Sequence, residues 1–156
     1  MTNHEQLCAE AKQTLDEILR RKEPLKPKDR LAIPAQEMPA QNPAERIRNM
    51  SEVATGYSEE QARLEAMRCL QCKNAPCVEG CPVKINIPEF VKAIAEGDNT
   101  KAIDIIKENS LLPAVCGRVC PQEIQCQLHC TVGKSLKNVD ISVSVGRLER
   151  FAADRE

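Results

Sequence analysis

Aromatic side chains are almost missing from this chain of 156 residues. It has no tryptophan, one tyrosine (Tyr57) and two phenylalanines (Phe90 and Phe151). Aromatic rings supply much of the buried area in most protein cores, so a core of alanine, leucine, isoleucine and valine lacks their bulk. The sequence therefore predicts that something other than side-chain packing helps to hold the fold together.

Three further absences narrow the possible functions. No apolar run is long enough to cross a bilayer, and the N-terminal residues contain no apolar signal core. The net charge is −1, without the basic excess typical of nucleic-acid binding. The six glycines never form G-x-G-x-x-G, the phosphate-binding pattern of dinucleotide sites. We expect a cytoplasmic protein with no nucleic-acid or membrane partner and no nucleotide site on this chain.

Cysteine is what the chain has in excess, with nine residues. In a cytoplasmic protein thiols stay reduced, and a dense set of them more often binds metal than forms disulfides. An odd number also suits a disulfide framework poorly. Metal binding is therefore the favoured interpretation, with disulfides as the weaker one.

Local patterns predict helices. Residues 3–22 repeat apolar side chains at helical spacing, whereas residues 23–43 hold five of the ten prolines and are expected to form an extended linker. Ser58 and Gln61 form a capping box that begins a helix ending near Cys69. Residues 88–109 are expected to form two short helices.

In that second region Pro88 suits a first helical turn, and Gly97 suits the break between the two helices. The only alternating, strand-like run is 139–145, which leads into an expected C-terminal helix. The predicted fold class is therefore all-α.

The cysteine spacing resembles that of ferredoxins. The two groups are Cys69-x2-Cys72-x4-Cys77-x3-Cys81-Pro82 and Cys116-x3-Cys120-Pro121-x4-Cys126-x3-Cys130. In ferredoxin-type runs three close cysteines hold one cluster, and a fourth, followed by proline, serves another. Eight thiolates would supply two four-iron clusters, leaving Cys8 aside. On this count Cys116 is a ligand.

Other cysteine chemistries agree less well with the spacing. Two structural zinc sites would more typically show two separate C-x2-C pairs, and only one exists here. Haem attachment requires C-x-x-C-H, but Lys73 follows Cys72. A thioredoxin-like C-x-x-C would need a βαβ pattern, which is absent.

Ordered motifs over about residues 43–156 carry a closer resemblance. They are Gly56-Tyr-Ser-Glu-Glu-Gln-Ala62, Ala66-Met-Arg-Cys-Leu-Gln-Cys-Lys73, Gly80-Cys-Pro-Val83, Ile87-Pro-Glu-Phe90, Cys116-Gly-Arg-Val-Cys-Pro-Gln122 and Gly146-Arg-Leu-Glu-Arg-Phe-Ala-Ala-Asp154. This region resembles the N-terminal iron–sulfur domain of the small (β) subunit of NADPH-dependent glutamate synthase. The same domain is shared with dihydropyrimidine dehydrogenase and the large subunit of NADH-dependent ferredoxin–NADP oxidoreductase.

The resemblance implies an α-helical ferredoxin-like domain with two 4Fe–4S clusters, and it changes the ligand assignment. It implies that one cluster is held by four thiolates, from Cys69, Cys72, Cys77 and Cys130. It implies that the other is held by three thiolates, from Cys81, Cys120 and Cys126, and by a carboxamide or carboxylate in a Gly-x-Leu-Gln/Glu motif, at the position of Glu149 here. Cys116 then becomes a small buried residue beneath the cluster.

The resemblance also implies the function. Residues 1–42 form an N-terminal helix and proline-rich linker, and residues 43–156 form the iron–sulfur domain. We expect a fragment of an oxidoreductase that is itself not catalytic, lacking the C-terminal FAD and NADPH domains of its parent. Its clusters would relay electrons from that flavin domain to a partner, most simply the large (α) subunit of glutamate synthase.

Two alternatives remain open. In the first, the clusters serve only to hold the fold and dock a partner subunit, as in an assembly module. Equally, the parent could be a pyrimidine-reducing enzyme or a ferredoxin–NADP oxidoreductase, since the domains that distinguish these proteins are not in this sequence.

Overall fold

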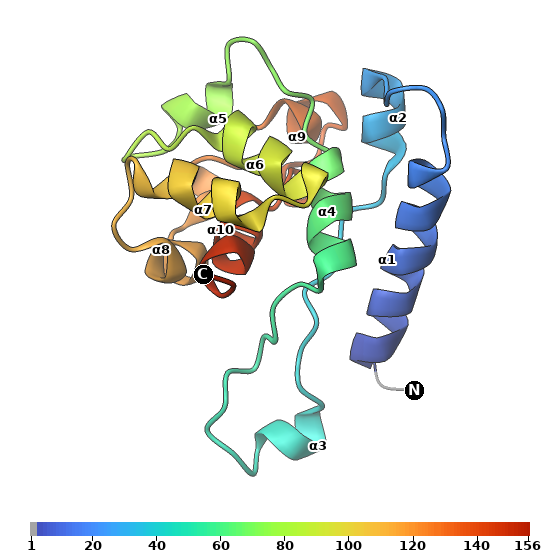
Figure 1. Cartoon of the computed structure of the whole chain (residues 1–156). Helices are drawn as coiled ribbons and strands as arrows, with labels where there is room; N and C mark the ends of the chain where they lie inside the picture. Colours follow the sequence, from blue (N-terminus) through green and yellow to red (C-terminus); the bar gives the residue numbers. More distant parts are fainter. Residues whose placement is uncertain (1–2) are drawn as a thin grey trace.

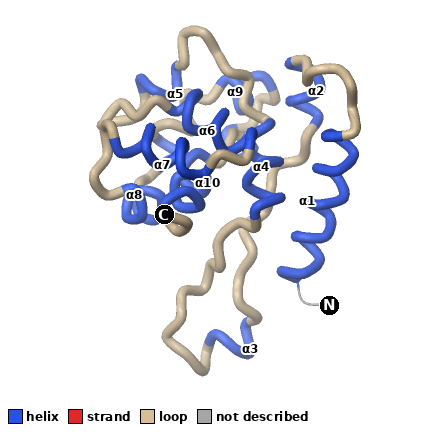
Figure 2. The backbone as a smooth tube through the Cα atoms, viewed as in Figure 1, coloured by secondary structure: helices blue, strands red, loops and turns tan. Residues whose placement is uncertain are grey.

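The computed structural model describes residues 3–156, and helices account for its regular structure (Figures 1 and 2). The α-helices are α1 (Asn3–Leu19), α2 (Pro27–Ala32), α3 (Pro43–Arg46), α4 (Glu59–Met67), α5 (Pro76–Glu79), α6 (Ile87–Glu96), α7 (Asn99–Lys107), α8 (Pro113–Val119), α9 (Thr131–Ser135) and α10 (Val145–Ala153). Two 3₁₀ turns span Gln122–Ile124 and Val139–Ile141. Over residues 3–156 there is no strand beyond one isolated bridge, Ala40 to Ala54. The all-α prediction is confirmed.

The main core lies where α4, α6, α7 and α10 meet. Helix α6 is strongly amphipathic, because Ile87, Phe90, Val91 and Ile94 recur at helical spacing and all are buried. The predicted break is present, since Gly97 ends α6 in the left-handed conformation (φ 84°) that glycine adopts without strain. Both phenylalanines are buried in this core, with Phe151 contributed by α10.

Helix α4 begins at the predicted capping box, with Ser58 and Gln61 bonded reciprocally. Near its end lies a buried ion pair, in which the Arg68 guanidinium donates to the Glu65 carboxylate at 2.6 Å. Arg68 also donates to the carbonyls of Ile141 and Ser142, and Glu65 accepts from the backbone N–H of Ser144. This pair therefore fastens α4 to the segment that precedes α10.

The N-terminal helix α1 packs alongside α4 (Figure 1). The contact is a small second core of Ala11, Leu15, Ile33, Leu64 and Met67. Because leucines and alanine share one face of α1, its amphipathic pattern finds a partner within the same chain. The N-terminal segment is thus packed against the remainder of the protein.

The proline-rich stretch, residues 23–43, differs from its prediction, since it contains the short helix α2 and the first residue of α3. Helix α2 has Pro27 in its first turn, and the Asp29 carboxylate accepts from the backbone N–H of Lys26 at 2.9 Å. From α2, Arg30 donates to the carbonyls of Met67 and Cys69. Proline disfavours helix interiors but suits their first turn, so counting prolines underestimated the helix content here.

Residues 40–54 form an arm that projects from the body and carries α3 at its tip (Figure 1). At its base Glu52 pairs with Arg118 of α8 and Arg150 of α10. In residues 3–156 we find no helix with the length and apolar character needed to span a membrane.

Candidate metal centre

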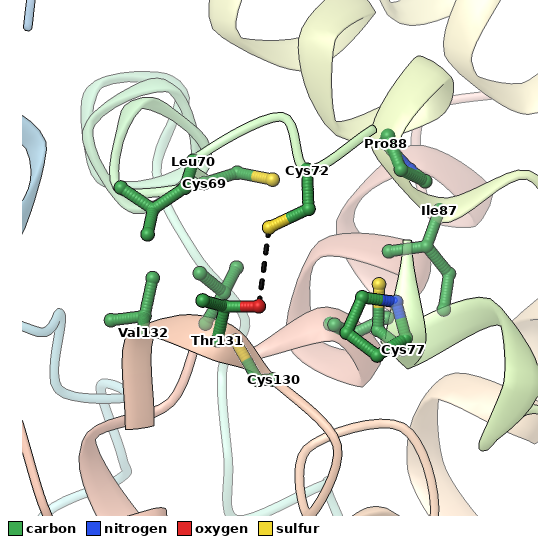
Figure 3. A pocket seen from close by; sticks show the side chains of 12 residues that line it. Cys69, Leu70, Cys72, Cys77, Ile87, Pro88, Cys130, Thr131 and Val132 are labelled. Carbon is green, nitrogen blue, oxygen red and sulfur yellow. Dashed lines mark hydrogen bonds between the residues drawn. The ribbon is translucent and has the colours of Figure 1, made fainter. Parts of the chain in front are cut away.

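Four of the predicted ligands surround one pocket. Cys69, Cys72, Cys77 and Cys130 line it, and Figure 3 shows their side chains around a common space. The pocket has about 390 Å³ of empty volume, including its opening to solvent. Three of these thiols come from residues 69–77, whereas Cys130 reaches the pocket from a distant part of the chain.

Local structure explains how these thiols converge. Cys69 and Cys72 lie in the loop that follows α4, where Gln71 adopts a left-handed conformation (φ 53°). The Gln71 side chain donates to the carbonyl of Pro88 at 3.0 Å, which fastens the loop to α6. Cys77 lies on α5 directly after Pro76, and Cys130 is the residue that caps α9.

The other predicted ligands surround a second pocket. Cys81, Cys120, Cys126 and Glu149 line it, together with Cys116. This pocket has about 500 Å³ of empty volume, again including open solvent. Its cysteines and Glu149 come from the loop after α5, from α8 and the loop after it, and from α10, so it depends on the packing of α8 against α10.

Glu149 is the unusual member of the second pocket. It is buried, with 6% of its surface exposed, although glutamates are normally on the surface. Its Oε1 atom has no hydrogen-bond partner, and burial raises the pKa of the carboxyl to about 7. A buried carboxylate oxygen without a partner is costly unless something positive reaches it. Three thiols and this oxygen form a donor set that suits an iron–sulfur cluster.

Cys116 lies in the same pocket and is half-buried. Its sulfur is 3.7 Å from the Ser110 hydroxyl oxygen. Cys116 lies in the same pocket as Cys120 and Glu149. The fourth ligand expected from the cysteine spacing (Cys116) and the one implied by the family resemblance (Glu149) therefore line the same pocket.

The thiols of both pockets are free and mostly desolvated. Burial raises the pKa of Cys69 to about 11 and that of Cys77 to about 12. In the second pocket, burial raises the pKa of Cys120 to about 11 and that of Cys126 to about 12. Metal ligation requires thiolates, so binding must release these protons.

Among residues 3–156, no three Cys, His, Asp or Glu side chains converge closely enough to hold a single metal ion.

Two glycines beside the predicted ligands have packing roles. A Cβ on Gly117 would lie 2.6 Å from the backbone nitrogen of Arg150, so glycine there allows α8 to approach α10. A Cβ on Gly80 would lie 2.7 Å from the carbonyl oxygen of Gln125. Both glycines bring together the segments that build the second pocket.

Sequence reasoning missed Thr131, which lines the first pocket. Its hydroxyl oxygen is 3.2 Å from the sulfur of Cys72 (Figure 3). The two residues are 59 positions apart, so no local pattern indicates the contact. The one available signal was that Thr131 follows Cys130 directly.

Comparison with known families gives a match over most of the chain. Residues 46–156 match the family described as dihydropyrimidine dehydrogenase domain II, 4Fe-4S cluster. The matched region contains both pockets and falls within the predicted iron–sulfur domain, residues 43–156.

Several curated proteins are similar in sequence. The small chain of NADPH glutamate synthase from Azospirillum brasilense is 35% identical over 121 residues, which cover 77% of this chain and 24% of the relative. The PreT subunit of NAD-dependent dihydropyrimidine dehydrogenase from Escherichia coli K12 is 38% identical over 119 residues, covering 76% and 26%. The glutamate synthase small chain of E. coli K12 is 38% identical over 104 residues, covering 67% and 21%. The chain thus spans about a quarter of the length of these relatives.

Proposed function

The chain belongs to the family of 4Fe-4S cluster domains typified by domain II of dihydropyrimidine dehydrogenase, and on that premise we propose that it holds two clusters and relays electrons within an oxidoreductase. One pocket would take a cluster on Cys69, Cys72, Cys77 and Cys130. The other would take a cluster on Cys81, Cys120, Cys126 and Glu149. The observation that carries the proposal is the presence of two separate pockets, each lined by one of these sets.

A four-iron cluster, when bound, accepts and gives up single electrons. The residues of this chain hold and tune such a group. Thiolates neutralise iron charge, while the surrounding leucine, isoleucine, valine and proline side chains keep water away from the first pocket. Glu149 supplies a harder donor than thiolate, so the second pocket offers a different ligand field from the first. Two sites of different potential suit a relay.

The parent protein is proposed from the relatives. They include small chains of glutamate synthase and a subunit of dihydropyrimidine dehydrogenase, and the two kinds have similar identity to this chain. We favour a glutamate synthase type, in which a C-terminal FAD and NADPH part of the parent supplies electrons and the large subunit receives them. A cytoplasmic location and the domain boundary at 42/43 are part of the same proposal.

The first experiment counts the clusters. Anaerobic reconstitution should give about eight irons and about eight sulfides per chain, as two four-iron clusters require. Reduction with dithionite should then produce electron paramagnetic resonance signals from both clusters. About four irons, or stoichiometric zinc in place of iron, would contradict the proposal.

The second experiment assigns the fourth ligand of the second pocket. Glu149→Ala should lower iron to about four per chain, whereas Cys116→Ala should keep about eight. These two side chains lie in the same pocket, so each variant is the control for the other. If Cys116→Ala loses a cluster and Glu149→Ala leaves both spectra unchanged, the ligand is Cys116.

The assembly-module alternative makes a different prediction. Clusters that only stabilise the fold need not change oxidation state at any accessible potential. Reversible one-electron reduction of both clusters by mediated titration would exclude a purely structural role. In the full-length parent, NADPH should reduce the same clusters, and addition of a glutamate synthase large subunit should reoxidise them.

A further inference from the structure

Thr131 is the polar exception in the lining of the first pocket. Apart from the four cysteines, the remaining side chains that line this pocket are leucine, isoleucine, valine and proline. The Thr131 hydroxyl lies 3.2 Å from the sulfur of Cys72, within hydrogen-bonding distance for sulfur (Figure 3). In surroundings this apolar, one hydrogen bond has a larger electrostatic effect than it would have in water.

The direction of this hydrogen bond depends on whether metal is bound. In the metal-free protein the Cys72 thiol donates to the Thr131 oxygen. A ligating cysteine has lost its proton, so its sulfur can only accept. The hydroxyl, which can donate as well as accept, then becomes the donor.

The position of the hydroxyl is fixed by its surroundings. Thr131 is the first residue of α9, directly after Cys130. The next residue, Val132, is 1% exposed, and a Cβ on Gly133 would lie 2.2 Å from the Ser142 hydroxyl, so α9 is closely packed. Threonine is also stiff about χ1 because it branches at Cβ.

We infer that Thr131 is a tuning residue for the first pocket, whose hydroxyl donates a hydrogen bond to the ligating sulfur of Cys72 and raises the reduction potential of the cluster bound there. The inference rests on the proposed function. Reduction adds one electron, which makes the cluster and its sulfurs more negative. A hydrogen bond donated to sulfur stabilises that more negative state, and hydrogen bonds to sulfur are one of the ways proteins set these potentials.

The test compares Thr131→Val, which keeps the shape but removes the hydroxyl, with Thr131→Ser, which keeps the hydroxyl. Each reconstituted protein is titrated anaerobically with dithionite and redox mediators, with one electron taken up per cluster. Iron and sulfide are measured on the same samples. The matched control is Thr14→Val, because the Thr14 hydroxyl bonds only within α1, to the carbonyl of Glu10.

We expect Thr131→Val to shift one of the two midpoint potentials to a more negative value and to leave the other unchanged. Thr131→Ser should restore the wild-type value, and Thr14→Val should match the wild type at both clusters. A Thr131→Val protein with full iron content and two wild-type potentials would overturn the inference. Iron loss in Thr131→Val but not in Thr131→Ser would support a hydroxyl acting on the cluster, whereas equal loss in both would refute it.

These outcomes are separable from failure of the proposed function. If wild-type protein binds no iron or cannot be reduced, the proposed function fails whatever residue 131 is. If the wild-type protein binds iron and is reduced normally, but neither midpoint potential changes when the Thr131 hydroxyl is removed, only the tuning role of Thr131 fails.

Discussion

Replacing Glu149 by glutamine should stabilise the metal-free protein at neutral pH. In the metal-free fold the carboxyl is buried with one oxygen lacking a partner, and burial raises its pKa from 4.5 to about 7. A tenfold change in acidity corresponds to about 1.4 kcal/mol, so this rise corresponds to about 3 kcal/mol of stability.

The direction of the stability change follows from the difference in proton binding between the folded and unfolded states. Below about pH 4.5 the carboxyl is protonated in both the folded and unfolded states, and it makes no difference to stability. Between pH 4.5 and about 7 the unfolded chain ionises first, so the free energy of unfolding decreases as pH increases, and the loss is complete above pH 7. Glutamine cannot ionise. Metal-free Glu149→Gln should therefore match the wild type at pH 4.5 and exceed its stability by about 3 kcal/mol at pH 7.5.

The assay is urea unfolding followed by circular dichroism between pH 4.5 and 7.5, on chelator-treated protein kept reduced. Sucrose, which favours compact states, retains a folded population. The control is Glu96→Gln at the exposed end of α6, for which we expect a change within about 0.5 kcal/mol. Parallel stability curves for wild type and Glu149→Gln across this pH range would refute the reasoning.

Three further predictions concern stability and binding. In iron-loaded protein, Glu65→Ala should lower the free energy of unfolding in urea by about 3–5 kcal/mol, because it leaves the Arg68 charge buried and unpaired. The control is Lys92→Ala, which breaks the exposed pair of Lys92 and Glu96 and should lower the free energy of unfolding by under about 1 kcal/mol. A loss below 1 kcal/mol for Glu65→Ala would contradict the role of this pair. Removing iron should lower the thermal midpoint and the helical signal strongly, since ligand binding and folding share one free energy, and an unchanged midpoint would count against this coupling. Calorimetry should detect no tight binding of NADPH or FAD to residues 1–156, and micromolar affinity for either would show that a nucleotide site had been missed.

Local sequence signals determined most of the helices. The Ser58 capping box, the apolar spacing around Phe90 and the break at Gly97 act over a few residues, so each could be predicted without the fold. The same holds for the chemistry of the thiols, because three cysteines within 69–77 indicate an iron–sulfur loop wherever they lie in space. The proline-rich stretch was the exception, since the short helix α2 within it depends on capping at Asp29 and on contacts such as that of Arg30 with the end of α4.

The tertiary structure decided which distant side chains meet. Spacing cannot show that Cys130 joins the thiols of 69–77, because that contact depends on how α9 packs beside the loop after α4. Nor can it show that Glu149 is buried, or that Thr131 contacts Cys72, since those positions follow from the packing of α9 and α10. Composition and spacing act along the chain, whereas a pocket is formed by segments far apart in sequence. For that reason the sequence by itself determined the kind of site, and helix packing determined the members of each pocket.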